Sequence, residues 1–189
     1  MNKTRKRIVE TADELFYQQG YARSSFAQIA EKLSISRGNF YYHFKSKDEI
    51  LDAVIQYRIS KTSGMLDQWD TEGSSPKQKI QSFVHILLRN KPKIILYGCP
   101  VGSLSSELIK LNHDSKNAVN YLYDLFLNWL SHQFCQLGLT DTADDLAMHL
   151  LALSQGVATM ASAFPDKNII DKEVIHIHQW LDRVTENTD

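Results

Sequence analysis

The segment SISRGNFYYHFKSKDEI, residues 34–50, mixes positive charges with aromatic rings around a single glycine, Gly38. Its run YYHF, residues 41–44, follows Arg37 closely and precedes the basic stretch KSK. A packed core excludes that many cations, and a solvated loop seldom carries that many rings. The composition therefore predicts a surface that contacts a partner both charged and flat.

The residues around this segment have the pattern of short helices. The apolar residues of the stretch 26–33 recur at i, i+3, i+4 and i+7, which predicts one short amphipathic helix. After the residues SIS, Ser36 can cap a second short helix over about residues 37–44. A longer helix over about residues 3–19, ended by Gly20, precedes both. Two short helices joined by a tight turn after a longer helix are the components of a helix-turn-helix.

The second short helix would be the recognition helix, which lies in the DNA major groove. Arg37 and Asn39 stand at its N-terminal end, where Arg can donate two hydrogen bonds to guanine and Asn suits adenine. Gly38 has no side chain and lets the backbone approach DNA closely. Lys47 would stand at the start of the next helix, whose free backbone N–H groups form an anion site.

The aromatic residues of this helix would divide between its faces. Tyr41 and Tyr42 can offer hydroxyls to phosphates or ring edges to a thymine methyl, and His43 can donate to a phosphate. Phe40 and Phe44 are one turn apart and would point inward as anchors. In the alternative, both tyrosines belong to the core and the cations are merely solvated. Adjacent helical residues point about 100° apart, so both tyrosines could not face one core well.

Charge is distributed unevenly along the 189 residues, although the net charge is only −1. Residues 1–47 hold nine Lys and Arg against four acidic residues, a net +5, and the rest holds twelve against eighteen, a net −6. A basic first quarter on an acidic body is typical of a nucleic-acid-binding head joined to a separate body. Chance clustering is an alternative that fits the charge pattern equally well.

The rest of the chain has the pattern of helices almost throughout, with four Pro, eight Gly and no convincing alternating strand. The clearest break is DTEGSSPKQ, residues 70–78, in which Pro76 opens a new helix. Residues 90–103 form a second irregular region, with Pro92 and Pro100 as breakers. Further helices are predicted over about residues 46–69, 76–90, 104–111, 114–137, 140–163 and 170–184. The predicted fold class is all-α.

Several other classes of protein lack support in the sequence. No apolar run approaches the roughly 20 residues of a membrane helix, and the basic start lacks the apolar region of a signal peptide. Cys99 and Cys135 are too few for a disulfide framework and fit a reducing cytoplasm. Without a nucleophile elbow, phosphate loop or dinucleotide fingerprint, we expect no enzyme activity and no cofactor. His176 and His178 point about 200° apart on a helix, so they predict no metal site.

Residues 5–55 resemble the TetR (TetR/AcrR) family of bacterial transcriptional regulators. The resemblance is carried by IVETADELFYQQGYARSSFAQIA at residues 8–30 and by FAQIAEKLSISRGNFYYHFKSKDEIL at residues 26–51. The chain departs from the family at Ser34, where many members have Gly, and at Asn39, where Thr or Ser is common. The second departure affects the expected base preference.

The resemblance implies a TetR-like all-α subunit of about nine helices. A three-helix helix-turn-helix head would cover residues 1–47, and a larger ligand-binding and dimerisation body would cover residues 48–189. The resemblance also implies a cytoplasmic homodimer that represses from a palindromic operator in double-stranded DNA and is released by a small-molecule inducer. It implies DNA contacts from Ser25, Arg37, Gly38, Asn39, Tyr41, Tyr42, His43 and Lys47. The alternative is a helical protein-interaction adaptor that has lost operator binding.

In the body, the resemblance implies that the last two helices pair with those of a second copy. Small residues within the stretch 146–163 would let helices approach closely. On the last helix, Val174, Ile177, Leu181 and Val184 form an apolar stripe for such pairing. The alternative is that both helices pack only within their own chain.

The inducer would be apolar or aromatic, because such cavities are lined by apolar and aromatic side chains with a few polar groups. The candidate lining residues, each of which could instead belong to the core, are Trp69, Phe83, Leu87, Tyr97, Cys99, Ser103, Tyr121, Tyr123, Phe126, Trp129 and Met160. The segment YGCPVGSLSSEL, residues 97–108, resembles one that borders the pocket in one group of these regulators. Cys99 would be a sensor of electrophiles or oxidants there, or else a small packed residue. Cys135 is interpreted as core.

Overall fold

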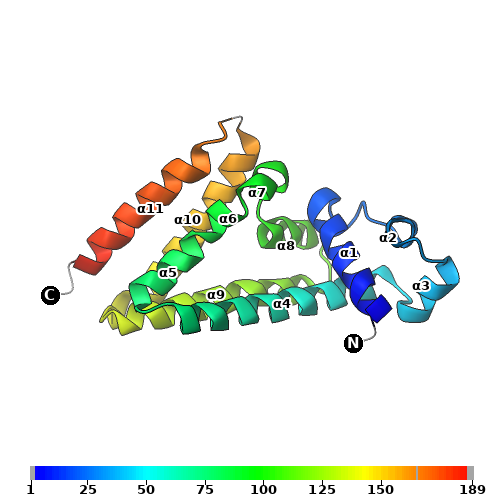
Figure 1. The fold of residues 1–189 in the computed structure, drawn as a ribbon, viewed down its shortest axis with the longest axis horizontal. Coiled ribbons are helices and arrows are strands. Elements are labelled where there is room, and N and C mark those ends of the chain that lie inside the picture. Colours follow the sequence, from blue (N-terminus) through cyan, green and yellow to red (C-terminus); the bar gives the residue numbers. More distant parts are fainter. Residues whose placement is uncertain (1–2, 165, 187–189) are drawn as a thin grey trace. The chain divides into compact units, whose positions relative to one another are not determined.

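The computed structural model describes residues 3–164 and 166–186, and within these it contains eleven α-helices, one 3-10 helix and no strand (Figure 1). The α-helices are α1 Lys3–Gln19, α2 Phe26–Leu33, α3 Arg37–His43, α4 Lys47–Glu72, α5 Pro76–Val84, α6 Ile86–Arg89, α7 Lys91–Tyr97, α8 Pro100–Lys110, α9 Lys116–Gln136, α10 Ala143–Ala163 and α11 Ile169–Glu186. The 3-10 helix, η1, is Thr140–Thr142. The predicted all-α class is confirmed.

The described residues form more helices than the nine or so expected, because the stretch 76–103 is divided more finely than predicted. It holds α5, α6 and α7 and the start of α8. The prediction that residues 90–103 are irregular was therefore wrong. Pro92 lies in the first turn of α7, and Pro100 is the first residue of α8. At these positions the missing N–H has no intrahelical partner to lose, so proline opens a helix instead of breaking one.

The chain divides into two compact units. The first unit consists of Met1–Lys61 and Pro100–Leu122, and the second unit consists of Thr62–Cys99 and Tyr123–Asp189. This division reflects which segments pack together. Helix α8 contacts α1 and therefore belongs with the N-terminal helices. The predicted boundary between residues 47 and 48 concerns the division of function, and it stays a prediction.

The core of the first unit joins the apolar faces of α1, α2, α3 and α8 to the first half of α4 (Figure 1). The predicted inner face of the first helix is confirmed, since Ile8, Ala12 and Phe16 are all buried. Ile50 and Leu51 of α4 are completely buried in the same cluster. Full burial of each large apolar side chain contributes about 1.5–3 kcal/mol, so this core fixes the position of α3.

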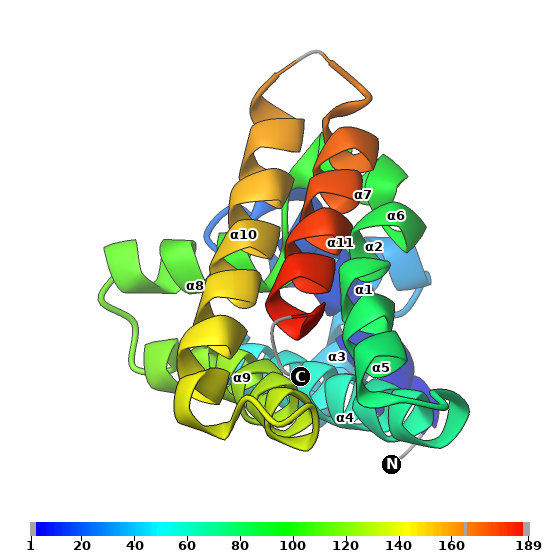
Figure 2. The same cartoon turned by 90° about the vertical axis from the view of Figure 1, so that its left-hand side faces the viewer.

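The second unit has a larger apolar core, to which α5, α9, α10 and α11 contribute. In it, α10 and α11 lie side by side (Figure 2) and bury Leu150, Val174, Ile177 and Leu181. By length and composition alone, Thr140–Ala163 could cross a membrane, but the core helices of water-soluble proteins pass the same test.

Candidate nucleic-acid interface

The turn between α2 and α3 is fixed by side-chain caps. Ser25 accepts a hydrogen bond from the backbone N–H of Gln28, whose side chain accepts one from the backbone N–H of Ser25, so α2 begins with a capping box. Ser34 ends α2 in the left-handed region with φ 54°. Ser36 then caps α3 through the backbone N–H of Asn39 at 3.2 Å. The spacing of the two helices is therefore set locally.

The aromatic residues of α3 divide between two faces. Phe40 and Phe44 are 1% and 0% exposed, as their spacing predicts, whereas Tyr41 and Tyr42 are 48% and 77% exposed. The ring of Phe26 lies 4.8 Å from that of Phe40 and 5.5 Å from that of Tyr41, between centroids. The phenylalanines anchor α3, and the structure leaves both tyrosines at the surface.

The N-terminal end of α3 is exposed at Arg37, Gly38 and Asn39. A Cβ atom added at Gly38 would meet nothing within 4 Å, so packing inside the chain does not require glycine there. A groove of about 310 Å³ between α2 and α3 is lined by Ser25, Phe26, Ala27, Ala30, Arg37, Phe40 and Tyr41. Three of the predicted DNA contacts thus line one groove.

Lys47, the first residue of α4, is held against the loop that follows α1. Its Nζ lies 4.2 Å from the ring centroid of Tyr21 and donates to the backbone oxygen of Ala22 at 3.1 Å. Burial lowers the pKa of Lys47, an effect opposed by the carboxylates of Glu107 and Asp48. The ammonium group therefore has a fixed position close to α3 but outside that helix.

Tyr21 is the centre of a polar network that sequence reasoning missed. Its hydroxyl donates a hydrogen bond to Oδ1 of Asp48. Nε2 of His113 lies 3.4 Å from the Tyr21 hydroxyl oxygen and 3.4 Å from Oδ1 of Asp48. Burial and the hydrogen bond with Asp48 raise the pKa of Tyr21, and that same hydrogen bond lowers the pKa of Asp48. The carboxylate of Glu107, on α8, accepts hydrogen bonds from the backbone N–H groups of Tyr21 and Ala22 at 2.7 Å and 2.8 Å. No periodic pattern signals partners so far apart in the chain.

Arg58 of α4 forms a second set of polar contacts between helices of the first unit. Its side chain is buried and donates to the carboxylate of Asp13 at 2.5 Å and to the backbone oxygen of Pro100 at 2.6 Å. One guanidinium group thus joins α1, α4 and the start of α8, a role for which a planar group with five N–H donors is suited.

The residues predicted to line an inducer cavity lie in different surroundings. Most are in the second unit, and Trp69, Phe83, Leu87, Phe126 and Trp129 belong to its buried core. Tyr97, Cys99 and Tyr123 are half-buried, and the last two pack against that core. Ser103 and Tyr121 belong to the first unit and are exposed, and Met160 is exposed on α10. The assignment of the whole set to one cavity stays a prediction.

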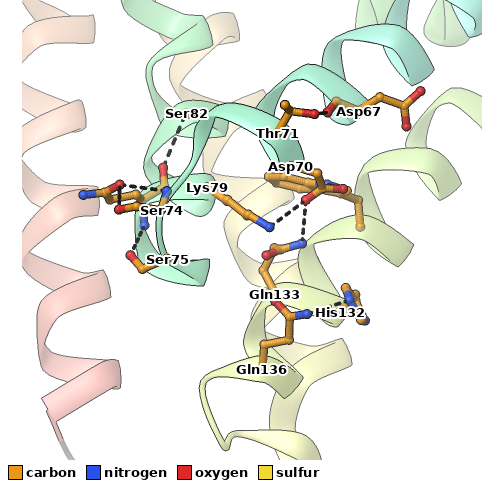
Figure 3. Close-up of polar contacts among 12 residues, drawn as sticks. Asp67, Asp70, Thr71, Ser74, Ser75, Lys79, Ser82, His132, Gln133 and Gln136 are labelled. Carbon is orange, nitrogen blue, oxygen red and sulfur yellow. Dashed lines mark hydrogen bonds and ion pairs between the residues drawn. The ribbon is translucent and has the colours of Figure 1, made fainter.

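A polar cluster at the edge of the second-unit core was also missed (Figure 3). The carboxylate of Asp70 accepts hydrogen bonds from the indole N–H of Trp129 at 3.0 Å and the amide of Gln133 at 3.3 Å, and Lys79 lies 3.3 Å away. The amide oxygen of Gln133 is buried and has no hydrogen-bond partner among the described residues. Burying an unsatisfied acceptor costs about 1–3 kcal/mol, so this oxygen is a weak point of the core.

Comparisons with known proteins agree with this geometry. A sequence model described as "Bacterial regulatory proteins, tetR family" matches residues 8–54. The chain is 26% identical to the "Uncharacterized HTH-type transcriptional regulator in lacX 3'region" of Lactococcus lactis subsp. lactis, over 98% of this chain and 97% of that protein. It is also 36% identical, over 90 residues, to the uncharacterized HTH-type transcriptional regulator YuxN of Bacillus subtilis (strain 168). That match covers 48% of this chain and 31% of YuxN.

A crystal structure of a TetR transcriptional regulator from Legionella pneumophila is similar to this fold, with a TM-score of 0.84 and 25% identity. The match covers 97% of this chain and 98% of that one. An exposed α3 behind a capped turn, on a three-helix core, is the arrangement of a helix-turn-helix DNA-binding protein. Within that class, residues 8–54 match the TetR family of bacterial transcriptional regulators, and the chain over nearly its whole length is similar to regulators of this kind.

Proposed function

We propose that this regulator is a repressor that binds a palindromic operator as a homodimer and is released by a small-molecule inducer. The observation that carries the proposal is the exposed face of α3, where Tyr42 is 77% exposed while the neighbouring Phe40 is 1% exposed. A large aromatic ring this exposed on a rigid helix is available to a partner. With Arg37 and Asn39 also exposed, DNA is the partner whose chemistry fits.

The proposed DNA contacts are the eight residues that the family resemblance implied. Arg37, Asn39 and Tyr42 would read base edges or the adjacent sugar and phosphate groups, and Gly38 would let the backbone approach closely. Lys47 would neutralise a phosphate. The adaptor alternative requires no DNA binding at low salt, whereas the repressor proposal requires binding that weakens steeply as salt is raised.

The proposed dimer surface is the exposed side of α10 and α11. Met148, Met160 and Ile175 are exposed by 54%, 45% and 57%. Next to them, a groove of about 440 Å³ is lined by His149, Ala152, Leu153, Gly156, Val157, Met160, Ile169 and Glu173. A second copy would cover these apolar side chains, and a two-fold dimer would match the symmetry of a palindrome.

This surface differs from the stripe that the sequence suggested on the last helix. Val174, Ile177 and Leu181 are buried in the core of their own unit, so they are not available to a second copy. The periodicity of an apolar stripe identifies a buried face but not the partner that buries it. The exposed Ile175 lies on the other side of α11.

The inducer would bind in the second unit, which holds most of the candidate lining residues and all three tryptophans, and the protein would act in the cytoplasm. Release follows if the inducer prefers a conformation that binds the operator weakly. By linkage, operator DNA must then weaken inducer binding by the same factor, about 5–150-fold in typical allosteric proteins.

Selection of bound sequences from random duplex DNA tests the proposal. The wild-type protein should enrich a palindrome, and Tyr42→Ala should lose that enrichment. Tyr121→Ala is the matched control, because Tyr121 is also an exposed tyrosine, 49% exposed, but lies on α9. No enrichment at low salt by a folded wild-type dimer would reject the repressor and favour the adaptor.

A further inference from the structure

His85 and His178 bring two imidazole rings together in the second unit. His85 is the residue between α5 and α6, and His178 lies within α11. Their Nε2 atoms are 3.2 Å apart and their ring centroids 5.1 Å apart, although the residues are separated by 93 positions in the sequence. Both side chains are half-buried, so their nitrogen atoms meet near the surface of the unit.

The geometry of this pair fits two imidazoles bound to one metal ion. Imidazole nitrogens bind Zn²⁺ at about 2.05 Å, so two of them on a tetrahedral ion lie about 3.3 Å apart, with ring centres about 5.2 Å apart. A head-on N–H···N hydrogen bond of the observed length would instead place the ring centres about 5.5 Å apart. The separation of 5.1 Å between the centroids fits the metal-bound arrangement and also a bent N–H···N hydrogen bond between the two neutral rings, so binding an ion requires little movement of either ring.

One ion pair lies beside the two imidazoles. Asp182 lies one turn after His178 on α11, where it pairs with Lys77 of α5 at 2.8 Å. The ammonium group of Lys77 neutralises this carboxylate, so the ion pair adds no net charge beside the imidazoles.

We propose that His85 and His178 bind one divalent transition-metal ion of the class of Zn²⁺, Ni²⁺ and Cu²⁺, with water at the remaining positions. Imidazole suits these ions, whereas Mg²⁺ and Ca²⁺ prefer oxygen ligands. No group of three or more His, Cys, Asp or Glu side chains in residues 3–164 and 166–186 is arranged to hold a metal. The site therefore has two protein ligands, and its affinity should be lower than that of a four-ligand structural site.

The position of the site indicates what an ion would do there. It would join α11 to the junction of α5 and α6, two parts of the second unit that also meet through side-chain packing and through the ion pair of Lys77 with Asp182. Because a bound ion stabilises the state that binds it, the metal should raise the melting temperature of the protein. This inference does not depend on the proposed repressor function.

Calorimetric titration of Ni²⁺ into untagged, chelator-treated protein at neutral pH tests the site. One ion should bind per chain, and His85→Ala and His178→Ala should each weaken binding by about tenfold or more. His176→Ala is the matched control, because His176 is exposed on the same helix and contacts Glu173 at 3.3 Å. His178→Gln provides a second variant that keeps a polar side chain in case the alanine variant folds poorly.

Either of two results of the Ni²⁺ titration would overturn the proposal. One is the absence of Ni²⁺ binding by the wild-type protein. The other is unchanged binding by folded His85 and His178 variants. Titration with Co²⁺ adds a spectroscopic check, since nitrogen ligands give visible bands without the thiolate charge-transfer absorption that Cys99 or Cys135 would produce. A strong thiolate band would assign the ion to a cysteine and also contradict the histidine site.

Discussion

In the first unit, a largely buried ion pair joins segments that are far apart in the sequence, whereas in the second unit such ion pairs are more exposed and a larger apolar core provides most of the packing. Arg58 and Glu107 link α1 and the loop after it to α4 and α8. The second unit instead buries whole faces of α10 and α11 around rings such as Phe134. Polar ties need specific geometry, and apolar cores tolerate repacking. The two units should therefore respond differently to substitution.

The largest expected effect is in the core of the second unit. Phe134 is completely buried, so Phe134→Ala should lower the free energy of unfolding by about 3–5 kcal/mol, through lost burial and the cavity left behind. Urea denaturation followed by far-ultraviolet circular dichroism measures this change. Leu96→Ala is the control, because Leu96 is 67% exposed and should change stability by less than about 0.5 kcal/mol. Equal effects of the two variants would contradict the assigned core.

A somewhat smaller effect is expected from Arg58→Met in the first unit. This change keeps much of the side-chain volume but leaves the carboxylate of Asp13, 25% exposed, without its cation. We expect a loss of about 2–3 kcal/mol in urea denaturation, below the upper range for fully buried pairs because Asp13 still reaches water.

Two further variants separate the ion pair from its context. Arg58→Met combined with Asp13→Asn should cost less than the sum of the single changes, because the two residues are in contact. Lys77→Met breaks the more exposed pair with Asp182 and should cost about 0.5 kcal/mol or less. Additivity of the first two changes would mean that the buried pair contributes no coupling.

Next in size is Glu107→Ala, which removes the acceptor of two backbone N–H groups. The expected cost is about 1–3 kcal/mol, because the N–H groups of Tyr21 and Ala22 lose a charged partner. Hydrogen exchange of the two amides should accelerate selectively. Glu107→Gln keeps one acceptor oxygen and should have an intermediate effect. Unchanged exchange at both amides would show that Glu107 does not hold this loop.

The network around Tyr21 should also make the first unit sensitive to acid. The hydrogen bond from Tyr21 holds the pKa of Asp48 below its ordinary value of 3.8, so the folded state favours the ionised carboxylate. That stabilisation is present above the ordinary pKa and is lost as the pH falls through the lowered one. Asp48→Asn should therefore be less stable than wild type at neutral pH. The difference should shrink below about pH 4, and a gap that is constant with pH would contradict this linkage.

The smallest expected change in stability is that of Gly38→Ala, which tests the exposed surface of the first unit and not its interior. Open space surrounds this position, and alanine is favoured over glycine in a helix by about 0.5–1 kcal/mol, so stability should not fall. Binding to the selected operator should nevertheless weaken. Gly64→Ala is the matched control, since it also lies in a helix with open space around it and should leave DNA binding unchanged.

Much of the fold could be predicted from sequence because helical periodicity reports which side of a helix is buried. It placed Phe40 and Phe44 inside and the adjacent tyrosines outside. It did not reveal which partner buries a face, so the stripe containing Ile177 was assigned to a second copy although its own unit buries it. Likewise, the prolines of residues 90–103 predicted breaks where they open helices.

The polar contacts could not be predicted, because they depend on how the helices pack and not on spacing along the chain. Glu107 meets Tyr21 across 86 residues, and His178 meets His85 across 93. The sequence instead suggested comparing His178 with His176, its neighbour on the same helix. An inducer cavity is harder still to predict, because its volume depends on small displacements of side chains that also serve as core.

The distribution of indole rings gives the molecule a built-in optical reporter. All three tryptophans of the sequence, Trp69, Trp129 and Trp180, belong to the second unit, and the aromatic residues of the first unit are tyrosines and phenylalanines. Trp69 and Trp129 have ring centroids 5.5 Å apart, close enough for their electronic transitions to couple in near-ultraviolet circular dichroism. Intrinsic emission excited at the red edge of the absorption band therefore reports on one unit alone. A small molecule that enters this unit can be followed without attaching a dye.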